Sequence, residues 1–382
     1  MLETSDVGVV ADDLTGACDV AACFASKAGA VGVWLSPVGK LSGGPPFQVI
    51  NTQSRLEHPQ TAGRILRRVG TWLAGKRIVF KKIDAGLRGP IGAELDGLLD
   101  GLRESGDDWS CVVAPAAPSI SRTSRGGVQY ENEVPIDQGA LSKDPNSPPH
   151  SANIRTVIEQ TGRGDCLICD AQTQEDLQQI VDAHLGESRF VFAGSLGLAM
   201  AVANRLGAAS YKPARGFPAR RPMIVCGSRH PRSIRQVERA KCGGIPILTF
   251  DPAFMRFDAT SAPGREGVII VRILPNEVGA NACSPLQLMG SFITALDPLL
   301  KRIEPDGLGI VGGETAYHLM QGLGAERLEV YQRHIEIIAC ARISGGVMDG
   351  KRMVCKGGSV GREDAVLQMI SLLTTTHGRE DA

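Results

Sequence analysis

The chain has 382 residues, which suggests two or three domains of about 150 residues each. Its 41 basic and 41 acidic side chains cancel, so no global positive field would gather nucleic acid or an anionic membrane. Hydrophobic residues make up 43% of the chain, yet no apolar run approaches the roughly 20 residues that cross a bilayer. We therefore expect a globular protein with neither nucleic-acid nor membrane partners.

Ten cysteines in a chain of this length are too sparse for a disulfide scaffold. Four of them stand inside apolar runs, where a buried thiol is the usual arrangement: Cys111, Cys226, Cys340 and Cys355. The first apolar run, Val7–Ala11, is interrupted at once by two aspartates, which argues against a signal peptide. These features favour the cytoplasm.

Short apolar runs alternate with helical stretches along the first half of the chain. Strands are predicted at Val7–Val10, Val31–Leu35, Val49–Ile50, Ile78–Phe80, Cys111–Ala114, Cys166–Cys169 and Phe190–Phe192. Helices are predicted at Ala17–Lys27, Pro59–Leu73 and Ile91–Leu102. Uniformly apolar strands separated by helices are typical of a largely parallel sheet covered on both faces.

Two segments break this alternation. The polar stretch Ser121–Ser151 contains a Gly-Gly pair and the prolines at 145, 148 and 149, and it is predicted to leave the sheet as a small hairpin and loop. Roles as a cleft wall and as the contact of a homodimer both stay open. The stretch 212–222 is rich in proline and arginine and is expected to link a domain at 1–211 to one at 223–382.

The alternation resumes in the second half. Strands are expected at Met223–Cys226, Val268–Ile273, Leu308–Val311 and Met353–Cys355. Helices are expected at Ser233–Cys242, at Leu286–Leu300, from about Thr315, and at the end of the chain as far as about Leu373. The predicted fold class is thus α/β, with two domains that each hold a largely parallel sheet flanked by helices, and an active site in the cleft between them.

Ligands of open α/β sheets bind beyond the carboxyl ends of the strands. In the first domain these ends carry acids, bases and hydroxyls, which suit a small polar anion: Asp12, Asp13, Ser54, Arg55, Lys82, Asp84, Arg88 and Ser195. In the second domain they carry glycines before helix starts and one lysine, which suit a phosphate: Gly227, Ser228, Gly312, Gly313, Glu314, Thr315, Lys356, Gly357, Gly358 and Ser359.

Structural roles compete with each of these assignments. An N-cap on the next helix would explain one of the two aspartates, and the arginines and lysines are equally suited to surface positions. Four known sequence motifs were considered and rejected. The glycines at 307, 309 and 312 precede their turn, GGSVG at 357–361 lacks suitably placed triad partners, Cys166 and Cys169 lack a second cysteine pair, and no P-loop is present.

Several motifs together resemble the four-carbon acid sugar kinases. ADDLTGACD, QSR at 53–55 and KKIDAGLRGPIGAEL at 81–95 are similar to the sugar-acid-binding domain of this family. CGSRHPRSIRQ at 226–236, GGETAYHLMQGLG at 312–324 and KGGSVGRED at 356–364 are similar to its nucleotide-binding domain. The resemblance spans nearly the whole chain in order, and D-D-L-T-G with K-K-x-D-x-x-L-R-G is its specific part.

The resemblance implies transfer of a phosphoryl group from ATP, with Mg²⁺, to the terminal hydroxyl of a tetronate such as threonate, erythronate or an oxo-tetronate. By position, the sugar acid would be held by Asp12, Asp13, Arg55, Lys82, Asp84 and Arg88. ATP would be held by Ser228, Gly312, Gly313, Glu314, Thr315, Gly357 and Gly358, with Lys356 near the transferring phosphate. The sequence departs from the family where Ala85 and Gly86 replace two hydroxyl residues and where Gly357 directly follows the lysine.

In the implied mechanism, Arg55 or Arg88 grips the substrate carboxylate and a carboxylate accepts the proton of the attacking hydroxyl. Asp13 and Asp84 are the candidate bases, and we favour Asp13. Glu314 would reach Mg²⁺ through water, and the two domains would close for transfer. Two alternatives stay open: a kinase for a branched or larger oxo-acid with Ala85 and Gly86 making room, and a non-catalytic sensor of sugar acid and nucleotide.

Overall fold

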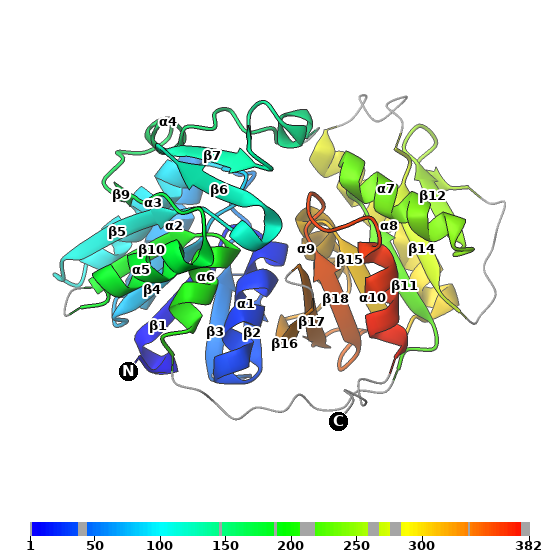
Figure 1. Ribbon diagram of the computed structural model, residues 1–382. Coiled ribbons are helices and arrows are strands. Elements are labelled where there is room, and N and C mark those ends of the chain that lie inside the picture. The colour runs from blue at the N-terminus through cyan, green and yellow to red at the C-terminus, as the bar shows by residue number, and fades with distance from the viewer. Residues whose placement is uncertain are drawn as a thin grey trace, which may run out of the picture. The chain divides into compact units, whose positions relative to one another are not determined.

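The computed structural model describes residues 2–36, 44–144, 147–186, 189–206, 218–258, 267–275, 284–334 and 337–375. The chain divides into two compact units, Met1–Tyr211 and Lys212–Ala382 (Figure 1). Of the linker expected at 212–222, residues 212–217 lie outside the described residues. Pro222 already belongs to the first strand of the second unit, so that residue is part of a sheet rather than of a connection.

Among its described residues, the first unit is built on a parallel sheet of seven strands in the order β2-β3-β1-β4-β10-β5-β9. The strands are β1 Val7–Ala11, β2 Val31–Trp34, β3 Phe47–Asn51, β4 Ile78–Lys82, β5 Trp109–Ala114, β9 Leu167–Ile168 and β10 Arg189–Gly194. Both β1 and β4 are buried along their whole length, including the two lysines that end β4, as expected for a sheet covered on both faces.

Helices of the first unit cover the two faces of this sheet (Figure 1). On one side α1 Leu14–Ala28 and α5 Gln174–His184 pack against α6 Leu196–Ala203; on the other, α2 Pro59–Leu73 packs against α3 Ile91–Arg103, which also contacts α4 Ile154–Glu159. A Cβ on Gly97 of α3 would lie 2.1 Å from the Gly63 carbonyl oxygen of α2, so only glycine permits this close approach.

The polar segment predicted to leave the sheet forms a separate antiparallel sheet, β6 Arg122–Arg125, β7 Val128–Glu131 and β8 Val134–Pro135. The first unit also contains short 3₁₀ turns, namely η1 Thr4–Asp6, η2 Pro118–Ile120 and η3 Ala140–Lys143. We call residues 121–144, which hold this small sheet and η3, the excursion.

The second unit has a mixed sheet in the order β13-β12-β14-β11-β15-β18-β17-β16. Its central strands β11 Pro222–Cys226, β12 Ile247–Asp251, β14 Ile269–Ile273, β15 Gly307–Val311 and β18 Arg352–Lys356 are parallel. Antiparallel strands flank them, namely β13 Arg256–Phe257, β16 Arg327–His334 and β17 Ile338–Ser344. The helices are α7 Pro231–Cys242, α8 Pro285–Ile303, α9 Gly313–Gly322 and α10 Ala365–Thr374.

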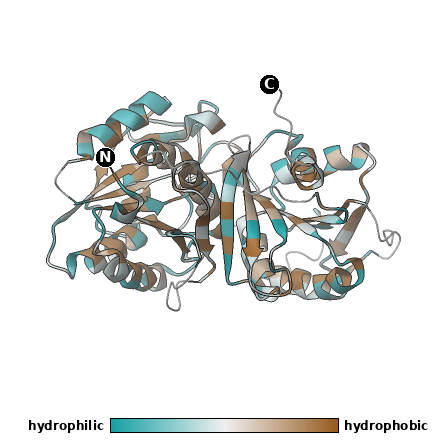
Figure 2. Ribbon diagram, turned by 90° about the horizontal axis from the view of Figure 1, so that it is seen from below, coloured by the Kyte–Doolittle hydropathy of each residue, from teal (hydrophilic) through white to brown (hydrophobic). Residues whose placement is uncertain are grey.

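Figure 2 shows hydrophobic residues concentrated in the strands and on the helix surfaces that face them. This distribution places the core of each unit between its sheet and its helices. The two-domain α/β class and the largely parallel sheets are confirmed. Among the described helices, none combines the length and the apolar composition that a membrane crossing requires.

Candidate functional site

The predicted sugar-acid residues gather at the carboxyl edge of the first unit's sheet. The ends of its central strands are level, because Ala11 of β1 is in register with Asn51 of β3 and with Lys82 of β4. The chain leaves β1 toward β2 and β3 on one side and returns to β4 on the other. The strand order therefore changes direction between β1 and β4, the place where open α/β sheets bind ligands.

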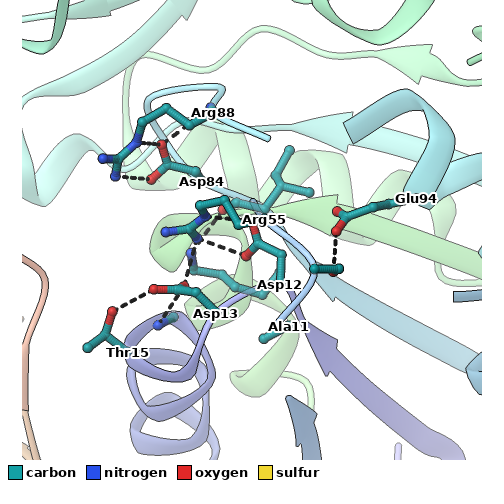
Figure 3. Close-up of polar contacts among 12 residues, drawn as sticks. Ala11, Asp12, Asp13, Thr15, Arg55, Asp84, Arg88 and Glu94 are labelled. Carbon is teal, nitrogen blue, oxygen red and sulfur yellow. Dashed lines mark hydrogen bonds and ion pairs between the residues drawn. The ribbon is translucent and has the colours of Figure 1, made fainter. Parts of the chain in front are cut away.

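Arg55 joins the two aspartates that follow β1 (Figure 3). Its Nε lies 2.8 Å from Asp12 Oδ2, and its Nη2 lies 2.8 Å from Asp12 Oδ1 and 2.7 Å from Asp13 Oδ1. The guanidinium is thus bidentate to Asp12 and bridges to Asp13, while no hydrogen bond of its Nη1 is found among the described residues. The sequence placed these three residues at one edge, and the structure brings them into direct contact.

Asp13 also caps helix α1. Its Oδ1 accepts the Gly16 backbone N–H at 3.0 Å, and its Oδ2 accepts the Thr15 hydroxyl at 2.7 Å. An N-cap was the structural alternative for one aspartate of the pair, and it holds for Asp13. The cap fixes the direction of the carboxylate beside the arginine.

The charges around Asp12 favour its ionised form. Burial alone would raise the pKa of this carboxyl, but the positive charges of Arg55, Lys81 and Lys82 and the hydrogen bond from Arg55 outweigh it. The pKa of Asp12 accordingly lies below its ordinary value of 3.8. Asp12 is therefore a carboxylate at neutral pH and holds Arg55 in place.

Lys82 differs from the other cations of this edge. Its Nζ donates to the Ile83 carbonyl at 2.9 Å, and no ion pair of Lys82 is found in the described part of the chain. A Cβ on Gly16 would lie 2.4 Å from Asp13 Oδ1 and 3.1 Å from Lys82 Nζ. The carboxylate of Asp13 and the ammonium of Lys82 thus lie close to the same glycine, which contributes no side chain of its own at this point.

A buried ion pair supports the site from inside, and the sequence analysis missed it. Lys81 Nζ lies 2.8 Å from Glu94 Oε2, both side chains are fully buried, and the Ser54 hydroxyl donates to Glu94 Oε1. Burial, the larger cause, and the negative charge of Asp12 raise the pKa of Glu94 despite the lysine. The sequence contained a signal for this pair. Adjacent residues of a strand point to opposite faces of the sheet, so Lys81 and Lys82 could not both face the ligand.

Asp84 and Arg88 form a second contact group with a partner from the excursion. Arg88 Nε and Nη2 lie 2.5 and 3.1 Å from the Asp84 carboxylate, and Nη1 lies 2.8 Å from Asp144 Oδ2. Burial would raise the pKa of Asp84, but the charges of Arg88, Arg55 and Arg122 hold it well below its ordinary value. Asp144 was not among the predicted site residues because it stands 56 residues after Arg88.

The replacement of hydroxyl residues at 85 and 86 opens no space at Gly86. A Cβ there would lie 2.8 Å from Asp84 Oδ2 and 3.1 Å from Leu141 Cδ1 of the excursion. The extra room suggested for a larger substrate is therefore absent at this position, because the side chains of Asp84 and Leu141 occupy it.

The glycine-rich ends of the second unit's strands also converge. Cys226, Val311 and Lys356 are in register at the ends of β11, β15 and β18. A Cβ on Gly312, the N-cap of α9, would meet Thr315 Oγ1 at 3.3 Å and Ser228 Cβ at 3.5 Å. The predicted nucleotide residues Gly313 and Glu314 form the first turn of α9. Exposed amides at such a helix start suit an anionic phosphate.

The last glycine loop lies against Ser228. A Cβ on Gly358 would approach Ser228 Oγ to 2.3 Å, and the Ser233 hydroxyl donates to the Gly358 carbonyl at 2.6 Å. Gln236 Nε2 donates to the carbonyls of Val360 and Gly361, both at 3.1 Å. The loop that begins at Gly357 is thus held by α7.

Lys356 is placed in the interior of the second unit. It is fully buried, and its Nζ donates to the carbonyls of Gly357 at 2.9 Å and Val360 at 3.1 Å. The structure shows a lysine that shapes the glycine loop. Contact between this ammonium and a phosphate stays a prediction.

The described cysteines are free thiols, and the four expected to be buried are buried. Cys166 and Cys169 flank β9 without forming a disulfide, and burial raises the pKa of Cys166 to about 11. Within the described ranges, no three histidine, cysteine or acidic side chains are placed to hold a metal ion.

Comparison with known proteins identifies both units. A family model described as the sugar-binding N-terminal domain matches residues 7–166, and one described as the nucleotide-binding C-terminal domain matches residues 285–366. Together these models match more than half of the chain.

Curated relatives align over almost their entire length. The chain is 24% identical to the D-erythronate kinase of Heliobacterium modesticaldum, covering 98% of this chain and 99% of the relative. It is 23% identical to the D-threonate kinase of Salmonella typhimurium (94% and 96%) and 24% identical to the 3-oxo-tetronate kinase of Actinobacillus succinogenes (94% and 97%).

Solved structures share the fold. A protein from Salmonella typhimurium LT2 matches with a TM-score of 0.70 at 18% identity, covering 95% of this chain and 98% of that one. A protein from Haemophilus influenzae matches with a TM-score of 0.63 at 19% identity, covering 95% and 100%. With both domain models matched in order and named relatives covered end to end, the chain belongs to the four-carbon acid sugar kinase family.

Proposed function

We propose that this protein is an ATP-dependent kinase that phosphorylates the terminal hydroxyl of a tetronate, either threonate, erythronate or an oxo-tetronate. The observation that carries the proposal is the placement of Asp13 and Lys82 close to the same glycine, Gly16, at the switch point of the first sheet. A fixed carboxylate opposite a cation that has no ion-pair partner among the described residues suits a hydroxylated anion. The names of the curated relatives support the same substrate class.

The contacts refine the expected roles. Arg88 already places each of its three nitrogens on a carboxylate, so we assign the grip on the substrate carboxylate to Lys82 and to the Nη1 edge of Arg55. Asp12 orients Arg55 through two hydrogen bonds. The favoured base remains Asp13, with Asp84 as the alternative.

The reaction joins the terminal oxygen of the acid to the γ-phosphorus of ATP. The bond between that phosphorus and the bridging oxygen breaks, ADP leaves, and the hydroxyl proton passes to the carboxylate of the base. The protein contributes positioning and charge neutralisation, which supply most of the rate in such transfers. Transfer requires the acceptor and the γ-phosphate to meet, so the proposal includes closure of the two units.

ATP is assigned to the second unit. The start of α9 with Gly312, Gly313 and Thr315 would receive phosphate oxygens, and Ser228, Gly357 and Gly358 would line the same edge. Mg²⁺ belongs to the proposal as a companion of the nucleotide. Such an ion usually keeps several waters and few protein ligands, and Glu314 is the residue that would reach it. When bound, it would neutralise phosphate charge.

A turnover panel tests the proposal. Purified protein is mixed with ATP, Mg²⁺ and each of the acids threonate, erythronate, 3-oxo-tetronate and a branched or larger oxo-acid, and ADP release is measured. We expect turnover with at least one tetronate and none with the larger acid. Calorimetric binding of acid and ATP without ADP release would instead support the sensor alternative. A cytoplasmic location and a homodimer stay predictions from the sequence.

A further inference from the structure

The excursion contacts the loop that carries Asp84 and Arg88. Its Asp144 follows η3, and its side chain is 9% exposed. The carboxylate reaches Arg88 Nη1 at 2.8 Å across 56 residues of sequence. Because both side chains of this ion pair are largely buried, salt screens the attraction little. Asp144 can therefore hold the guanidinium of Arg88 in one orientation.

Two further contacts fix the backbone of the same loop. Gln129 of β7 is fully buried, and its Nε2 donates to the Ala85 carbonyl at 3.0 Å. Leu141 of η3 is fully buried, and its Cδ1 would lie 3.1 Å from a Cβ on Gly86. The excursion therefore touches this loop through a charge, a carbonyl and an apolar side chain.

Arg88 stands between two carboxylates. Asp84 accepts from Nε and Nη2 and Asp144 accepts from Nη1, so each nitrogen of the guanidinium already donates to a carboxylate of the protein. In this arrangement Arg88 orients Asp84, which is the alternative base of the proposed function. Asp144 in turn limits the positions that Arg88 can take.

We propose that Asp144 is a positioning residue that acts on the acceptor site through Arg88, so that the excursion takes part in substrate recognition. This inference rests on the proposed kinase function. It names a residue that touches neither Asp84 nor, in our assignment, the substrate. Its effect on turnover must therefore disappear when Arg88 is removed.

A double-mutant cycle tests this dependence. The variants are Asp144→Asn, Arg88→Met and both together, with Glu133→Gln as the matched control. Glu133 lies on the same excursion, pairs with Arg125, and has a side chain that is 70% exposed. Steady-state kcat and KM for acid and for ATP are measured, and thermal unfolding is followed for each variant.

We expect Asp144→Asn to lower kcat/KM for the acid about tenfold with the KM for ATP unchanged, a loss typical of a displaced active-site group. The double variant should match Arg88→Met within about twofold, and Glu133→Gln should match wild type. Should Asp144→Asn not fold, Asp144→Ser provides the same comparison.

The inference would be overturned if the losses in kcat/KM of the two single variants added up in the double variant, or if they were equal for the acid and for ATP. The proposed function would still stand in both cases. A wild-type protein without acid-dependent turnover would overturn both. Lower thermal stability with unchanged kinetics would show a structural role only and would also overturn the inference.

Discussion

Lys81 and Lys82 are neighbours on β4 and end in different surroundings: Lys81 Nζ lies 2.8 Å from Glu94 Oε2, whereas Lys82 Nζ donates to the Ile83 carbonyl. The first lysine is part of the buried framework, and the second faces the candidate site. The alternation of side chains along a strand separates the two roles.

Substitution of each lysine should therefore give opposite results. Lys82→Met should raise the KM for the sugar acid at least tenfold with little loss of stability, because it removes a charge-assisted contact to the ligand. Lys81→Met should lower the free energy of unfolding by about 3–5 kcal/mol, because it leaves Glu94 buried without its partner. Denaturant unfolding and steady-state kinetics of both variants check this. A stability loss confined to Lys82→Met would contradict the assignment.

Asp13 has two roles that substitution can separate. Asp13→Asn keeps an N-cap side chain but removes the charge, so we expect turnover to fall below detection while α1 stays capped. Asp13→Ala should cost about 1 kcal/mol more in stability than the asparagine variant. The control is Thr173→Ala, which removes the cap of α5 and should cost about 1 kcal/mol without altering kinetics. Full activity in Asp13→Asn would exclude Asp13 as the base.

The glycine loop of the second unit predicts a selective defect in nucleotide binding. A Cβ on Gly358 would come within 2.3 Å of Ser228 Oγ, so Gly358→Ala must displace one side of the assigned ATP site. We expect a higher Kd for ATP, measured by calorimetry, and an unchanged Kd for the acid. Gly290→Ala on α8 is the control, since apart from the backbone of its own helix no described atom lies within 4 Å of its Cβ position. It should stabilise the protein by about 0.5–1 kcal/mol and leave both affinities unchanged. Equal effects on both ligands in Gly358→Ala would argue against separate sites.

The lowered pKa of Asp84 predicts how stability depends on pH. Its folded-state pKa lies well below the ordinary 3.8, so its ionised form stabilises the fold above that value. This contribution decreases as pH falls below about 4 toward the folded pKa. The free energy of unfolding of wild type should exceed that of Asp84→Asn at pH 7 and at pH 5, and the difference should shrink at pH 3. A difference that grows toward acid pH would contradict the charge environment described for Asp84.

The sequence predicted which residues gather at each sheet edge, but not how they pair. Uniformly apolar strands indicate a parallel sheet, and parallel strands end at one edge, so Asp12, Arg55 and Lys82 could be grouped in advance. Their partners depend on chain segments far apart in sequence, as Asp144 and Arg88 show. No local pattern encodes such contacts.

The secondary structure likewise includes elements that the sequence predicted and elements that it did not. α2 begins and ends where the apolar period predicts, whereas α1 starts at Leu14 rather than Ala17 because the Asp13 cap extends it by one turn. The antiparallel β16 and β17 were not predicted. In β16 polar residues alternate with buried apolar ones, a pattern that a search for uniformly apolar runs passes over. In β17 the buried apolar run Ile338–Ala341 was present in the sequence and was not assigned to a strand.

Phosphorus NMR of a reaction with ATP, Mg²⁺ and the preferred tetronate would observe the transferred phosphoryl group itself. We expect the γ-phosphate signal of ATP to be replaced by a phosphomonoester signal that couples to the protons of the terminal carbon of the acid, with no such signal from Asp13→Asn. Release of inorganic phosphate without a new ester, or no acid-dependent change with any tetronate, would contradict the proposed function.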